Sequence, residues 1–288
     1  MAKTIEEGWR EFHTRLTPTS TEDTYASSHR LSLESCLKAN FGMTRFARIG
    51  SFGNGTSITG HSDTDYIAVC PGDKLPDNSA NALTKVRDVL DYRYTDTDVK
   101  VRTPAVRLEF GTTAAQKTEI VPAYHRSTYE GYKVYGIADG EGGWMNASPD
   151  AHNDYVRDVN LKHSGQVKKL IRYVKAWKYF RDVPISSFYL EMRTAKYADG
   201  ESSIIYSIDV KNVLRNILNG GLARMQDPTG IGGYIYPCKT ELKHEDALSK
   251  LETAVIRAEK AREAEEAGRV VDAFDWSNKL YYYEYPKY

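Results

Sequence analysis

Cysteine is scarce in this sequence, and it has neither a long apolar run nor an excess of one charge. The three cysteines, Cys36, Cys70 and Cys238, form no Cys-x-x-Cys pair and no Cys/His cluster, which argues against a zinc ribbon and a disulfide framework. No stretch approaches the roughly 18 consecutive apolar residues of a membrane span. The charged N-terminus lacks the apolar segment of a secretory signal. We therefore expect a cytoplasmic protein with reduced thiols and no membrane partner.

Positive and negative side chains are balanced. Lys and Arg together number 39, as do Asp and Glu, so the formal net charge is zero. Proteins that grip a long nucleic-acid duplex usually carry a basic excess, so no such partner is expected. The 288 residues suffice for one large domain or for two modest domains that share a core.

The first 125 residues combine helical and strand patterns. A helix is predicted over 20–42, with Ser20 or Thr21 as its cap and Gly42 at its end. A second, amphipathic helix is predicted over 78–94. Alternating or apolar segments bounded by Gly or Pro predict strands over 44–53, 63–71, 98–111 and 117–125.

The rest of the chain has a different pattern. A glycine-rich connection contains the expected boundary, near 138–150. Helical periodicity follows over 150–182, 184–198, 206–220 and 243–280. The tyrosine-rich YYYEYP near the end is expected to pack the tail onto the core.

The stretch GSFGNGTSITGHSDTD, residues 50–65, contains the most informative motif. Residues i and i+2 of a strand share a face, so Asp63 and Asp65 would project together. Two such carboxylates repel each other unless a cation lies between them, and oxygen ligands suit Mg²⁺ or Mn²⁺. The glycines and hydroxyls upstream would let a phosphate approach the main chain. Either feature alone is common in ordinary turns, and the stretch matches neither a P-loop nor a dinucleotide fingerprint.

The combination IGSFGNGTSITGHSDTDYIAV resembles the signature of the polymerase-β-like nucleotidyltransferases. The resemblance implies a third carboxylate on a neighbouring strand, and Glu119 of EIVPAY supplies it, where Asp is commoner. Asp63, Asp65 and Glu119 would then be catalytic and would hold two Mg²⁺ or Mn²⁺ ions. Gly50 and Ser51 would fix the β and γ phosphates of the donor nucleotide. Without this context, Glu119 would be interpreted as a surface acid.

The segment VKKLIRYVKAWKYFRDVPISSFYLEMRTA resembles cyclic GMP-AMP synthase and its bacterial relatives, the CD-NTases. The resemblance implies that Lys169 contacts the triphosphate, that Ser187 lies near the donor base or phosphates, and that Phe188 stacks on a base. Three alternatives stay open: Phe188 in the core, Ser186 or Ser187 as a helix cap, and a solvated face of lysines comprising Lys168, Lys169, Lys175 and Lys178.

The implied fold is α+β and bilobed with a central cleft. A polymerase-β-like core of mixed sheet and helices would span 1–145, with an N-terminal helix reaching both lobes, and a helical domain, 146–288, would complete the nucleotide pocket. The implied activity is synthesis of cyclic di- or trinucleotide second messengers from ATP, GTP or pyrimidine triphosphates, with release of pyrophosphate. A separate effector would sense the product in CBASS-type anti-phage signalling. Two alternatives are transfer to an RNA 3′ end, a protein or a small molecule, and a binding module without catalysis.

Overall fold

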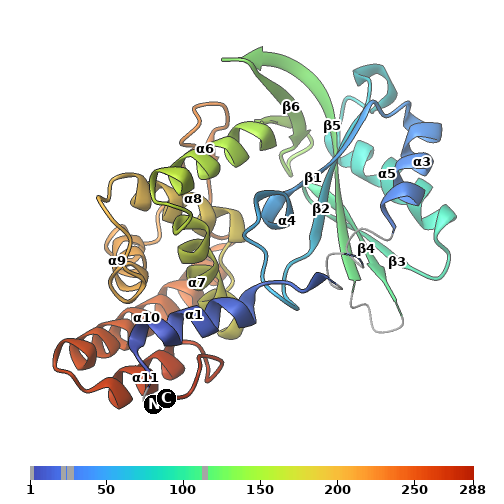
Figure 1. The fold of residues 1–288 in the computed structure, drawn as a ribbon. Coiled ribbons are helices and arrows are strands. Elements are labelled where there is room, and N and C mark those ends of the chain that lie inside the picture. The colour runs from blue at the N-terminus through green and yellow to red at the C-terminus, as the bar shows by residue number, and fades with distance from the viewer. Residues whose placement is uncertain (1–2, 21–23, 25–28, 112–115) are drawn as a thin grey trace.

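A seven-stranded mixed sheet forms one half of the molecule, and a group of helices forms the other (Figure 1). The computed structural model describes residues 3–20, 24, 29–111 and 116–288. The strands of the sheet are β1 (Arg45–Ile49), β2 (Thr64–Val69), β3 (Asp98–Arg102), β4 (Ala105–Phe110), β5 (Gln116–Tyr129), β6 (Tyr132–Ala138) and β7 (Trp144–Ala147). A separate two-stranded hairpin consists of β8 (Met225–Gln226) and β9 (Tyr234–Ile235).

The helices fall on both sides of this division. Those of the first half of the chain are α1 (Ile5–Leu16), α3 (Arg30–Phe41), α4 (Gly50–Asn54) and α5 (Ser79–Arg93), with a 3₁₀ turn η1 (Gly72–Lys74). Those of the second half are α6 (Pro149–Lys162), α7 (Val167–Phe180), α8 (Ser187–Asp199), α9 (Tyr206–Asn219), α10 (Glu241–Glu266) and α11 (Val270–Leu280). No helix of the described part of the chain is long and apolar enough to cross a membrane.

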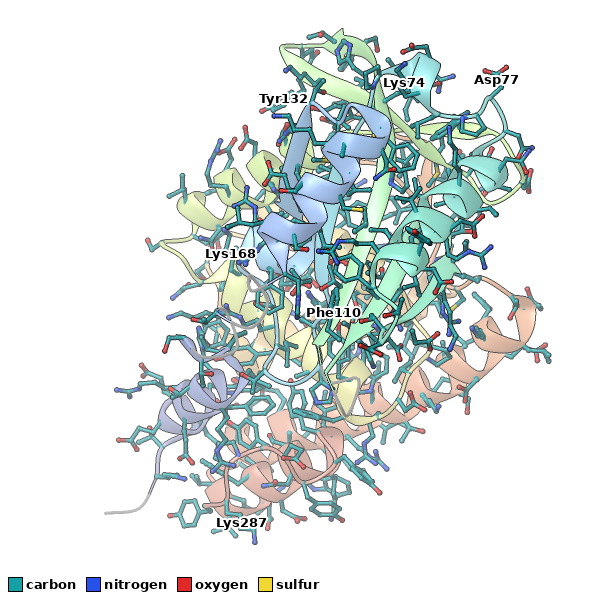
Figure 2. The ribbon with its side chains drawn as sticks, turned by 90° about the vertical axis from the view of Figure 1, so that its right-hand side faces the viewer. Lys74, Asp77, Phe110, Tyr132, Lys168 and Lys287 are labelled. Carbon is teal, nitrogen blue, oxygen red and sulfur yellow. The ribbon has the colours of Figure 1, made fainter. Side chains whose placement is uncertain are left out.

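The sheet has the strand order β1-β2-β5-β4-β3, and β6 and β7 extend it from the second part of β5. Only the β2–β5 pair is parallel among the strand pairs of the described chain. Helices α3 and α5 lie across one face of the sheet (Figure 2). Their apolar side chains, including Leu37 and Leu90, share a buried cluster with strand residues such as Ile120. The sheet half contacts the helical half where α4, which packs on β1 and β2, lies against α6, and where α6 contacts β6.

The predicted N-terminal helix needs a correction. The helix α3 begins at Arg30 with His29 as its cap, so neither Ser20 nor Thr21 starts it, and Thr21 lies outside the described residues. The His29 ring stacks on Phe110 at 3.8 Å, which ties the start of α3 to the sheet. The predicted end is confirmed, because Gly42 adopts the left-handed conformation, with φ of 61°.

The helical half is assembled from both ends of the chain. Trp9 and Phe12 of α1 are buried with α7 and with the C-terminal tyrosines Tyr281 and Tyr285. The prediction that YYYEYP packs onto the core is therefore confirmed for these two rings. The described part of the N-terminal region thus places α1 in the helical half and α3 on the sheet. The helix that reaches both lobes stays a prediction. The division at residue 145 stays a prediction.

Candidate active site

The glycine-rich stretch begins with a short helix that was predicted as the end of a strand. Strand β1 ends at Ile49, and α4 starts at Gly50, whose φ is +63°. A Cβ atom on Gly50 would lie 2.1 Å from Oδ2 of Asp65. Only glycine permits both this backbone conformation and this approach. The main chain at Gly50 is therefore held directly against the Asp65 carboxylate.

Three charged residues of the site lie in one row across the adjacent strands β2, β5 and β4. Asp65 pairs with Glu119 on the parallel strands β2 and β5, and Glu119 pairs with Arg107 on β4. Side chains in register on adjacent strands share a face. Asp63 precedes β2 by one residue and faces the same group, because its Oδ2 accepts a hydrogen bond from Nη2 of Arg107 at 2.8 Å. The structure thus brings together the three predicted carboxylates.

Arg107 is a residue of this site that we did not predict from the sequence. Its Nε donates to Oε1 of Glu119 at 2.8 Å while its Nη2 contacts Asp63. Its only sequence signal is an arginine within an apolar strand pattern, AVRLEF. That pattern does not show which strand pairs with β4. The acids that lie next to Arg107 could therefore not be identified from the sequence.

The surroundings of the site disfavour the charged form of two of its carboxylates. Burial raises the pKa of Asp65 well above its usual value, and the nearby Glu119 and Asp63 raise it further. Burial also raises the pKa of Asp63, and Arg107 opposes this effect. The pKa of Arg107 is itself raised, because the attraction of Asp63 and Glu119 outweighs burial. A cation placed here would be stabilised by the same field.

Carboxylate oxygens are the ligands that Mg²⁺ and Mn²⁺ prefer, and the row places them on adjacent strands, so these residues fit a divalent metal. Within the described residues, however, no three metal-ligating side chains are gathered closely enough to form a ligand set as they stand. Arg107 lies between Asp63 and Glu119 and supplies the positive charge. Arg107 contacts Oδ2 of Asp63 and Oε1 of Glu119, so an ion would bind through the second oxygen of each carboxylate or replace Arg107.

A lysine of α7 faces this row from the helical half. Lys178 Nζ donates to Oγ of Ser187 at 2.6 Å, and the charge of Asp63 acts on it. Burial and the neighbouring Lys175 lower the pKa of Lys178 to about 8. The alternative of a solvated lysine face is therefore wrong for Lys178. Ser186, not Ser187, caps α8, since its side chain accepts from the Tyr189 N–H.

Lys169 lies elsewhere on α7. Its side chain is exposed, and together with Arg172 its charge lowers the pKa of His13, after the larger effect of burial. Nine residues separate it from Lys178, which is about 13 Å of helix rise. The predicted triphosphate contact of Lys169 stays a prediction. The α7 lysines whose charges act on the acids are Lys178, on Asp63, and Lys175, on Asp65.

Phe188 is 40% exposed at the start of α8, so the alternative that it belongs to the core is wrong. Its ring meets the edge of His152 at 4.9 Å. The Nε2 atom of His152 lies 3.0 Å from Oδ2 of the buried Asp227. Burial would raise the pKa of Asp227, but the hydrogen bond with His152 and those from the Thr229 and Gly232 N–H groups lower it to about 2. This partner lies 75 positions from His152, and sequence spacing could not reveal it.

A buried polar network connects the glycine-rich stretch to the helical half. Glu191 of α8 accepts from Nδ2 of Asn54 at 2.5 Å and from Oγ1 of Thr56 at 2.6 Å. Lys175 of α7 donates to the Thr56 carbonyl at 3.1 Å and lies 3.3 Å from Oε2 of Glu191. All four side chains are buried, so Lys175 is not part of a solvated face. The network holds the chain after α4 against α7 and α8.

The lowered pKa of Lys178 predicts a pH dependence for substrate capture. Lys178 is positive below its pKa of about 8 and neutral above it, so attraction for a triphosphate is lost as the pH rises through 8. The sequence predicts a nucleoside triphosphate as the substrate. Because kcat/KM reports the free enzyme, we expect kcat/KM for that substrate to fall between pH 7 and 9. Lys178→Arg, which stays charged over this range, should show a smaller decline. An equal decline in both proteins would assign it to another group.

The sequence of this chain resembles those of known proteins. The profile described as the Second Messenger Oligonucleotide or Dinucleotide Synthetase domain (SMODS) matches residues 4–160. A relative from Bacillus cereus (strain VD146), named probable cyclic nucleotide synthase IK1_05630, is 32% identical over 152 residues. That match covers 48% of this chain and 45% of the relative, so it spans less than half of the relative's length.

Solved structures share the fold at low sequence identity. CdnC of E. coli MS115-1, solved with ATP, has a TM-score of 0.74 and 15% identity, over 97% of this chain and 98% of that chain. The CD-NTase CdnG of Bradyrhizobium diazoefficiens, solved with GTP, has a TM-score of 0.68 and 12% identity, over 95% and 97%. DncV cyclic AMP-GMP synthase of Vibrio cholerae, solved with a linear intermediate, has a TM-score of 0.66 and 16% identity, over 100% and 83%.

These likenesses confirm the predicted fold class, α+β with a mixed sheet and a helical half. The SMODS profile covers more than half of the 288 residues and includes Asp63, Asp65, Arg107 and Glu119. The chain therefore belongs to the SMODS family of second messenger oligonucleotide or dinucleotide synthetases.

Proposed function

We propose that this protein is a metal-dependent nucleotidyltransferase that makes cyclic di- or trinucleotides from nucleoside triphosphates. The observation that carries the proposal is the row of Asp65, Glu119 and Arg107 with Asp63 beside it, where Gly50 lies against one end and Lys178 faces it. The relatives that were solved with ATP, with GTP or with a linear intermediate support it. The substrates would be ATP, GTP or pyrimidine triphosphates.

In this proposal each group has a separate task. Asp63, Asp65 and Glu119 would hold two divalent ions, Mg²⁺ or Mn²⁺, which would polarise the α-phosphate and activate the attacking hydroxyl. The backbone of Gly50 and Ser51 would orient the β and γ phosphates.

The helical half would complete the pocket. Lys178 and Ser187 would bind the triphosphate together, with Lys169 as a further, outer contact. The exposed Phe188 ring would stack on a base, which is worth about 1–3 kcal/mol. We also propose a domain division near residue 145, with a catalytic core over 1–145, from which α1 packs onto the helical half, and a helical domain over 146–288.

The reaction forms one phosphodiester bond per transfer. A ribose hydroxyl of the acceptor nucleotide attacks the α-phosphate of the donor, the hydroxyl proton is released, and pyrophosphate leaves. A second transfer within the linear product closes the ring. We propose further that the protein acts in the cytoplasm in CBASS-type anti-phage signalling, where a separate effector senses the product. No long duplex would be required.

The test is the product itself. Purified protein incubated with the four ribonucleoside triphosphates and Mg²⁺ or Mn²⁺ should form a phosphatase-resistant cyclic product that mass spectrometry identifies. Chelation of the metal should remove it, and so should the double substitution Asp63→Asn with Asp65→Asn. Product formation that survives the double substitution would contradict the proposal. Label transferred to RNA or protein would favour a different acceptor, and binding without pyrophosphate release would favour a catalytically inactive module.

A further inference from the structure

A second cationic site lies in the helical half, between α7 and α10. A groove of about 260 Å³ is lined by Trp177, Arg181, Ser249, Lys250, Thr253 and Arg257. Three of these residues carry positive charge, two carry hydroxyl groups, and none is acidic. The chain as a whole has no net charge, so the groove is a local concentration of positive charge.

Neither arginine of the groove has an acidic partner in the described part of the chain. Arg181 donates to the carbonyl of Leu280 at 3.2 Å and also to that of Lys279, and it lies 4.8 Å from the Tyr282 ring centroid. Burial and the neighbouring charge of Arg257 lower the pKa of Arg181. This like-charge contact is unfavourable until an anion enters between the two groups.

The positive charge of Lys250 is only partly balanced by a neighbouring acid. Its Nζ lies 2.8 Å from Oδ2 of Asp246 and donates to the Asp182 carbonyl at 2.9 Å, at the end of α7. Ser249 and Thr253, which are exposed on α10, lie one turn apart beside it. The Thr253 hydroxyl already donates to the Ser249 carbonyl at 3.2 Å, so the Ser249 hydroxyl and the cationic groups are the donors that fit phosphate oxygens. The volume exceeds that of several water molecules, each about 30 Å³, so more than one phosphate has room.

The groove is separate from the carboxylate row. Its lining includes Trp177 and Arg181 but none of Asp63, Asp65, Glu119 and Lys178. Arg181, at the C-cap of α7, is three positions from Lys178, so the variants below are chosen to distinguish the two sites.

We propose that this groove binds an oligophosphate group, carried by a nucleotide or by free inorganic oligophosphate. This inference does not depend on the proposed function. Its probes are sodium tripolyphosphate and ATP, each titrated calorimetrically at low salt with a chelator present to remove divalent ions.

Four single-residue variants make the test specific to the groove. Arg257→Gln removes a charge that has no ion-pair or hydrogen-bond partner in the described chain, so folding should be preserved, and we expect at least tenfold weaker tripolyphosphate binding. Lys250→Gln should weaken it similarly. Lys243→Gln, an exposed charge on the same helix outside the groove, should bind as the wild type does, and Lys178→Gln should retain the groove site.

The outcomes separate the possibilities. Binding of ATP that Arg257→Gln weakens identifies a nucleotide as a source of the phosphates, whereas binding of tripolyphosphate alone identifies the free anion. Unchanged tripolyphosphate affinity in both groove variants would overturn the proposal, as would its loss in Lys178→Gln alone. Binding seen only with a long DNA duplex would overturn it in favour of a nucleic-acid surface.

Discussion

Replacement of Gly50 with alanine should lower product formation to the background level of the Asp63→Asn, Asp65→Asn protein. The added Cβ would lie 2.1 Å from Oδ2 of Asp65 and 2.9 Å from its Cγ, and real side chains do not tolerate such distances. The carboxylate or the start of α4 must shift, and displacement of a reacting group by about 1 Å can cost about 100-fold in rate. The measurement is the initial rate of pyrophosphate release at saturating metal and nucleotide.

Gly60→Ala is the matched control for this prediction. Gly60 has a similar φ of +71°, but a Cβ there would meet no atom within 4 Å. Both substitutions share the cost of a left-handed alanine, about 1–2 kcal/mol, and only Gly50→Ala adds the collision with Asp65. If both variants lose activity equally, backbone strain and not the approach to Asp65 explains the requirement for glycine.

Lys175→Met should destabilise the folded protein more than any single change at the surface. It would leave the Glu191 carboxylate buried with Asn54 and Thr56 but without its cation. Removal of one partner from a buried ion pair typically costs about 3–5 kcal/mol. Denaturant unfolding should show this loss in the free energy of unfolding, and thermal unfolding should show a melting temperature lower by roughly 5–8 °C.

Two further variants test whether loss of the buried ion pair causes the destabilisation. Lys169→Met removes an exposed lysine from the same helix, and its effect should stay within about 0.5 kcal/mol. The double variant Lys175→Met with Glu191→Leu removes both charges and should recover part of the loss, because a well-packed apolar pair can replace a buried ion pair. A loss below about 1 kcal/mol in Lys175→Met would contradict the buried network as a determinant of stability.

Local sequence patterns predicted the parts of the site that lie close together in the chain. Asp63 and Asp65 are two positions apart at the start of a strand, and Gly50 and Ser51 stand before them. Glu119 required a family resemblance, since only strand pairing brings β5 beside β2. Arg107 depended on a second pairing, between β4 and β5, for which the sequence carried no distinct signal.

The rotation of α7 was the main point that sequence reasoning did not resolve. By helical spacing Lys175 and Lys178 are neighbours, and Lys169 lies on the opposite side of the helix from Lys178, but the sequence does not say which side faces the carboxylates. The packing of α7 against α1, α8 and α9 exposes Lys169 and buries Lys175. Which lysine faces the carboxylates therefore follows from tertiary contacts, and so does the pairing of His152 with Asp227.

The contact between α1 and the C-terminal tyrosines has a consequence for synthesis on the ribosome. Trp9 and Phe12 emerge early, yet their partners Tyr281 and Tyr285 are made about 270 residues later. The strands and helices of the sheet half, between residues 30 and 147, have their partners much sooner. Domains generally fold as units while the chain is made. The sheet half can thus fold cotranslationally, whereas the apolar face of α1 is covered in two stages, first by Tyr173 and Tyr206 and later by Tyr281 and Tyr285. The part that contacts the two later tyrosines stays uncovered in the interval, which makes it a place for a chaperone to bind the nascent chain.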